Sequence, residues 1–91
     1  MAFSVTNPQI AGTAVQIINP TTGSVTDPVP CAVFNNDSVN TLFIGGPGVT
    51  STTGFPILKQ TGMSFRLMVS DPIFAVTSGP TIDVRVIIGR Q

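Results

Sequence analysis

The chain has 91 residues, of which 9% are charged; four basic residues balance four acidic ones, and the sequence holds no His, Trp or Tyr. Without histidine, the usual general base and the commonest metal ligand are missing, and the single cysteine, Cys31, cannot form an intramolecular disulfide or a thiolate zinc site. Scattered, balanced charges predict no nucleic-acid partner. No apolar run approaches the about 20 residues of a membrane span, which predicts no membrane partner. We therefore expect one domain, residues 1–91, with no catalytic residue, no cofactor and no metal site.

Glycine and proline punctuate the chain at short intervals, with apolar β-branched runs between them. This spacing predicts an all-β fold, a single small antiparallel β-sandwich of jelly-roll-like type with about eight short strands. The predicted strands are Phe3–Thr6, Ala14–Ile18, Cys31–Phe34, Thr41–Ile44, Phe55–Leu58, Met63–Val69, Ile73–Thr77 and Thr81–Ile88. We expect residues 31–91 to form the core, and the Gly-, Pro- and Thr-rich residues 1–30 to be looser, as an extended arm or a long loop.

Two predicted strands alternate cleanly enough to assign their faces. The residues expected to face the core are Phe65, Leu67 and Val69 in one strand and Ile82, Val84, Val86 and Ile88 in the other. The opposite face carries Arg66 and Met68 in the first strand, and Asp83, Arg85 and Ile87 in the second. Two interpretations stay open: the charges pair across strands, or the face contacts a partner protein. Arg66, Arg85, Met68 and Ile87 are accordingly the candidate partner interface.

Other segments that resemble binding motifs are predicted to be structural. Gly46–Ser51 is close to a dinucleotide fingerprint, but no helix start follows it, so we expect a Gly-rich turn. Asn35–Asp37, even with Asp71, offers too few carboxylates for calcium and predicts a tight turn. Cys31 lies in an apolar strand and is expected to be a small buried thiol. The six phenylalanines are spread along the chain and are expected in the core, not in a stacking platform.

Several short motifs follow one another between Asn40 and Arg90. They are Leu42-Phe43-Ile44-Gly45-Gly46, Val49-Thr50, Gly54-Phe55-Pro56, Gly62-Met63-Ser64, Asp71-Pro72-Ile73-Phe74-Ala75-Val76 and Val84-Arg85-Val86. In this order they resemble a family of small phage virion proteins of the capsid decoration or cement type, similar to head fibres. The resemblance implies a non-enzymatic β-sandwich on the virion exterior that stabilises a phage head by bridging its major capsid subunits.

The resemblance also implies the partners and the location. We expect the chain to bind the major capsid protein and further copies of itself, as a homotrimer, after synthesis in the host cytoplasm without secretion. Two alternatives stay open. A tail, collar or fibre component shares the fold and the chemistry, whereas a small carbohydrate-binding module typically needs an exposed Trp or Tyr platform, which this chain lacks.

Overall fold

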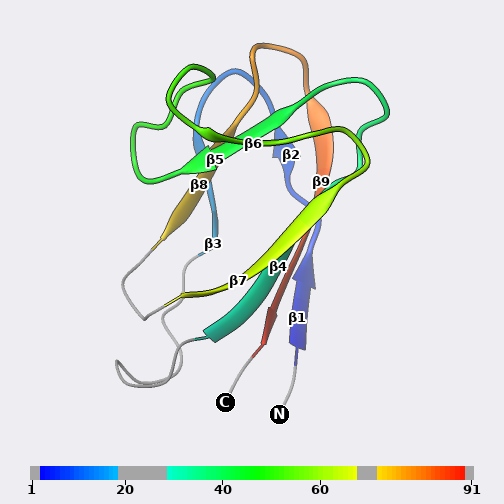
Figure 1. The fold of residues 1–91 in the computed structure, drawn as a ribbon, viewed down its shortest axis with the longest axis vertical. Coiled ribbons are helices and arrows are strands. Elements are labelled where there is room, and N and C mark those ends of the chain that lie inside the picture. Colours follow the sequence, from blue (N-terminus) through cyan, green and yellow to red (C-terminus); the bar gives the residue numbers. More distant parts are fainter. Residues whose placement is uncertain (1–2, 19–28, 68–71, 90–91) are drawn as a thin grey trace.

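The computed structural model describes residues 3–18, 29–67 and 72–89, and in these ranges the chain is built from strands arranged in two layers (Figure 1). The strands are β1 (Phe3–Thr6), β2 (Gln9–Ile10), β3 (Val15–Ile18), β4 (Val29–Asn35), β5 (Leu42–Gly45), β6 (Phe55–Ile57), β7 (Gly62–Leu67), β8 (Ile73–Val76) and β9 (Ile82–Gly89). The described residues contain no helix long and apolar enough to cross a membrane.

The strands form two antiparallel sheets. Sheet I has the order β1-β9-β4-β7, and the short strand β2 also pairs with β9. Sheet II has the order β3-β8-β5-β6. The predicted all-β, antiparallel sandwich is therefore confirmed. The described part of the chain has nine strands, one more than the eight predicted segments, because the two-residue strand β2 precedes β3.

The core between the sheets consists mainly of branched aliphatic side chains. Its buried residues are Ile10, Ile17, Ile18, Cys31, Val33, Leu42, Ile44, Ile57, Ala75, Ile82, Val84 and Val86. The prediction that the phenylalanines form the core is wrong: none of those with described side chains is fully buried, and Phe55 is 59% exposed. Inward residues from both sheets fill the narrow space between them, and Phe65 is a partly buried ring that packs against this cluster.

Residues 3–18 belong to the sandwich. β1 and β2 both pair with β9, and β3 pairs with β8, so this segment contributes an edge to each sheet. Ile10, Ile17 and Ile18 are buried in the core. The expected arm or long loop is therefore not what the structure shows for residues 3–18, because three isoleucines there complete the core. Residues 19–28 lie outside the described ranges.

A buried amide ties the end of β4 to sheet II. Asn35 is 0% exposed, and its Nδ2 donates to the carbonyl oxygens of Asn40 (2.9 Å) and Ile57 (3.0 Å). Its Oδ1 accepts from the backbone N–H of Asp37 at 3.0 Å. The carboxylate of Asp37 in turn accepts from the backbone N–H groups of Asn40 and Val39, which lower its pKa. The Asn-rich segment is thus the predicted tight turn, with its side chains engaged within the protein.

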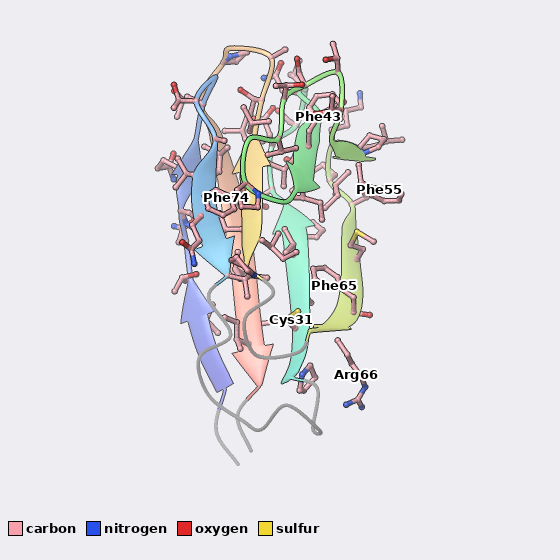
Figure 2. All side chains as sticks on the ribbon, turned by 90° about the vertical axis from the view of Figure 1, so that its left-hand side faces the viewer. Cys31, Phe43, Phe55, Phe65, Arg66 and Phe74 are labelled. Carbon is pink, nitrogen blue, oxygen red and sulfur yellow. The ribbon has the colours of Figure 1, made fainter. Side chains whose placement is uncertain are left out.

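The segment between β5 and β6 covers part of the outer face of sheet II. Val49 is buried, and a Cβ atom placed on Gly45 would lie 2.9 Å from its Cγ2. A Cβ on Gly54 would lie 2.7 Å from Cβ of Phe43, so the loop returns closely over the sheet. Figure 2 shows this loop in front of β5. The Gly-rich segment is a turn, as predicted, and it gives sheet II its own cover.

Candidate docking surface

The outer face of sheet I, called here the sheet I face, carries a row of apolar residues. The strand register places Val5 beside Ile87 and Ile87 beside Ala32, with Phe34 and Arg85 opposite each other in the adjacent row. These residues surround a shallow hollow of about 140 Å³. Its lining consists of Val5, Ala32, Phe34, Arg85, Val86 and Ile87. This face therefore offers an apolar depression, in contrast to the loop-covered face of sheet II.

The hollow arises because strands of sheet I are apolar on both faces. In β4, Cys31 and Val33 point into the core, so Ala32 and Phe34 point outward. Val5 on β1 is 67% exposed, and Phe34 on β4 and Ile87 on the intervening strand β9 are each 36% exposed, so three apolar side chains that line one hollow are open to solvent. Gly62 on β7 makes room for the ring, because a Cβ there would lie 3.0 Å from Cδ1 of Phe34.

The charged groups at the end of the sheet I face neutralise each other. Arg85 binds Asp83 with an Nη2–Oδ2 distance of 3.1 Å. The same carboxylate accepts from Asn36 Nδ2 and Gln9 Nε2, each at 2.9 Å. The hydrogen bond from Asn36, with those from Arg85 and Gln9, lowers the pKa of Asp83. The hollow is therefore bordered by a neutral polar network, and a partner for this face needs apolar surface more than charge.

The structure brings together part of the predicted interface. Arg85 and Ile87 line the same hollow. Arg66 is exposed and lies opposite Pro30 in the register, on the same face but farther along β7, and Figure 2 shows it projecting from the lower end of that strand. Met68 lies outside the described residues. Arg85 pairs with Asp83 of its own strand β9, so the expected pairing of charges across strands is not what the structure shows for this residue. Arg85 also borders the hollow, and its contact with a partner stays a prediction.

Sequence reasoning missed Val5, Ala32 and Phe34. The signal was present in strand alternation: when Cys31 and Val33 face the core, the remaining positions of the strand are also apolar. A strand whose residues are apolar on both faces predicts either a sheet that is buried on both sides or an outer face that is covered by another molecule or segment. The assignment of every phenylalanine to the core concealed this pattern for Phe34.

Cys31 is a buried thiol, as predicted. It is 6% exposed, and its Sγ donates to the carbonyl oxygen of Phe65 at 3.4 Å. Burial raises the pKa of the thiol to about 11. The group is therefore protonated at neutral pH and shielded from reaction in the folded protein.

A comparison with solved structures finds similarity in fold. A solved structure of a protein from Bacillus endospore appendages, which form a novel family of disulfide-linked pili, has a TM-score of 0.55 to this chain with 19% identical residues. The alignment covers 96% of this chain and 82% of the appendage protein. At this identity, the similarity concerns the fold. No family model and no curated protein matches the sequence.

Proposed function

We propose that this chain is a non-enzymatic structural protein of a phage virion that decorates the capsid exterior and docks through the sheet I face. The observation that carries the proposal is the apolar hollow around Val5, Phe34 and Ile87, which no segment of the described chain covers. Grouped, exposed apolar side chains are typical of interaction surfaces. The sequence motifs between Asn40 and Arg90 supply the virion context.

The partner expected at this face is the major capsid protein. The neutral network around Asp83 and Arg85 matches a contact that relies on shape and apolar burial, with little dependence on salt. Binding that favours the assembled shell over its free subunits would stabilise the shell by mass action. The fold is compatible with a structural role, because the appendage protein of similar fold belongs to a pilus.

The proposed linkage between copies differs from that of the appendage pili. Those pili are described as disulfide-linked. In this chain the single cysteine is 6% exposed, and the pKa of its thiol is raised to about 11. Any assembly of this protein is therefore expected to rely on non-covalent contacts.

The first test is the copy number of the chain in purified phage particles, measured by quantitative mass spectrometry against the major capsid protein. A ratio near one-to-one supports capsid decoration. A few copies per particle would overturn it and favour a tail, collar or fibre component. Absence from the particles would overturn the virion assignment and return attention to a carbohydrate-binding module.

The second test addresses the docking face. Purified protein is added to capsids that lack it, and bound protein is measured by co-sedimentation. Ile87→Asp introduces a charge at the hollow and is expected to weaken binding by at least about tenfold. Leu58→Asp is the matched control, because Leu58 is 61% exposed on the segment between β6 and β7 and does not line the hollow. Equal binding of the two variants would contradict docking through the sheet I face.

A further inference from the structure

The edges of the two sheets differ in how they resist the addition of another strand. In sheet II, the edge strand β6 carries Pro56, and the edge strand β3 has a register shift between Gln16 and Ile18. Both features hinder strand pairing. In sheet I, the edge strands β1 and β7 hold no proline and pair with β9 and β4 in unbroken register. Figure 2 shows them at opposite edges of sheet I.

The backbone of β7 directs hydrogen-bonding groups away from the sheet. The backbone N–H of Asn35 donates to the carbonyl oxygen of Thr61 at 2.8 Å, which makes these two residues a hydrogen-bonded pair. Antiparallel pairs alternate between hydrogen-bonded and non-hydrogen-bonded. Gly62, Ser64 and Arg66 therefore turn their N–H and C=O groups to the open edge. All three residues are exposed, and within the described ranges no loop bonds to their backbone.

The same argument applies to β1 at the other edge. The backbone N–H of Val84 donates to the carbonyl oxygen of Pro8 at 3.2 Å, in the register that continues through Thr6 and Val86. Thr6 therefore bonds inward to β9, and the alternate residues Phe3 and Val5 turn their backbone groups outward. Within the described residues, these groups also have no backbone partner.

The two open edges of sheet I are complementary to each other. β1 runs antiparallel to β9, β9 to β4 and β4 to β7, so β1 and β7 run in opposite directions. A second copy placed beside the first in the same orientation would bring its β1 antiparallel to β7. The side chains of the residues that bond outward also lie on the same side of the sheet. Val5 lies on the sheet I face, and Ser64 lies on it as well because Ser64 pairs with Ala32. A copy related by translation therefore meets both requirements of antiparallel pairing: opposite strand direction and matching side-chain alternation.

We propose that this protein associates with a second copy of itself by adding β1 of one molecule to the open edge of β7 of the next. Pairing of this kind extends sheet I across molecules and leaves no open edge between them. A two-fold pairing of β7 with β7 would leave both β1 edges open, which is the less protected arrangement. Head-to-tail contacts produce closed rings, such as the expected homotrimer, or open chains. The proposal does not depend on the virion assignment, and it leaves the hollow of the sheet I face free.

Two proline variants test the contact. In Ser64→Pro, the lost N–H points to the open edge, so the ladder with β4 is retained. In Val5→Pro, the lost N–H also points to the open edge, so the hydrogen bonds between β1 and β9 are retained. Each variant is expected to weaken self-association of the purified protein by at least about tenfold in sedimentation velocity, because one edge can no longer pair. Ser64→Ala keeps the backbone N–H and is the control, with association equal to that of the unchanged chain.

A mixture of the two variants distinguishes head-to-tail pairing from two-fold pairing. Ser64→Pro keeps an open β1 edge and Val5→Pro keeps an open β7 edge, so an equimolar mixture is expected to form heterodimers although each variant alone is monomeric. Self-association of Val5→Pro alone at the strength of the unchanged chain would show β7–β7 pairing and overturn the proposal.

Amide exchange of the unchanged chain gives a test that needs no variant. As the protein concentration rises, exchange at the Val5 and Ser64 amides is expected to slow, whereas exchange in the exposed Thr50–Thr53 turn stays constant. A protein that remains monomeric up to millimolar concentration, with no change at these two amides, would also overturn the proposal.

Discussion

The buried amide of Asn35 gives the most quantitative prediction of the fold. Its side chain makes three hydrogen bonds, with the carbonyl oxygens of Asn40 and Ile57 and the N–H of Asp37. Each contributes about 1 kcal/mol, so Asn35→Ala is expected to lower the free energy of unfolding by about 3 kcal/mol. For a domain of this size that corresponds to a fall in Tm of about 12–24 °C. The loss is large because the amide is buried and all three of its partners, the carbonyl oxygens of Asn40 and Ile57 and the N–H of Asp37, lose their bond to it.

Urea unfolding followed by far-UV circular dichroism measures this loss, since the chain has no Trp or Tyr for fluorescence. The matched control is Asn36→Ala, which removes a half-buried amide with one bond, to Asp83, and is expected to cost less. Asn35→Asp, nearly equal in volume, places a carboxylate against two carbonyl oxygens. Burial raises the pKa of that carboxyl, so the variant's loss in free energy of unfolding, relative to the unchanged chain, should shrink as the pH falls. If Asn35→Ala were as stable as Asn36→Ala, the conclusion that the buried Asn35 amide stabilises the contact between β4 and sheet II would be refuted.

Three further outcomes follow from burial and charge. Leu42 is 0% exposed, so Leu42→Ala lowers the free energy of unfolding by about 2–5 kcal/mol, whereas the exposed Leu58→Ala changes it by less than about 0.5 kcal/mol; equal effects in the same titration would contradict this packing. The Cys31 thiol, with its pKa near 11, reacts with a disulfide reagent far more slowly in the folded protein than in urea, and equal rates would contradict its burial. The pKa values of Asp37 and Asp83 are lower in the folded protein than in the unfolded chain. These carboxylates therefore stabilise the fold at pH values above the ordinary aspartate pKa, and this stabilisation is lost as the pH falls through their folded pKa values. Asp83→Asn should flatten this decline, and parallel pH profiles of the two proteins would go against it.

Alternation in the sequence identified the parts of the fold in which local pattern and burial agree. Ile82, Val84 and Val86 face the core as their period of two predicts. The Asn-rich and Gly-rich segments form the turns that their side chains and backbone freedom favour. In each case a few neighbouring residues determine the outcome, so the sequence is sufficient.

The errors have a different physical origin. Within residues 7–18, the predicted strand Ala14–Ile18 is found as β3, but the two-residue strand β2 was missed. The isoleucines of both strands are buried only through pairing with β8 and β9, which are distant in sequence. Such pairing leaves little local pattern. The hollow of the sheet I face likewise joins Val5, Phe34 and Ile87 from three strands, and only their register places them together. Arg85 and Ile87 were found because their own strand alternates clearly.

The proposed edge contact and the proposed docking face reinforce each other. If copies join through β1 and β7 as an open chain, every hollow points to the same side, because translation preserves the orientation of the sheet I face. A hollow of about 140 Å³ is too small to bind a partner tightly by itself. When copies are linked, however, binding of one hollow to the capsid raises the effective concentration of the next hollow at the neighbouring capsid site. Ile87→Asp should then reduce capsid binding without changing self-association, whereas Ser64→Pro should reduce both. An Ser64→Pro protein that binds capsids as tightly as the unchanged chain would show that the two surfaces act independently.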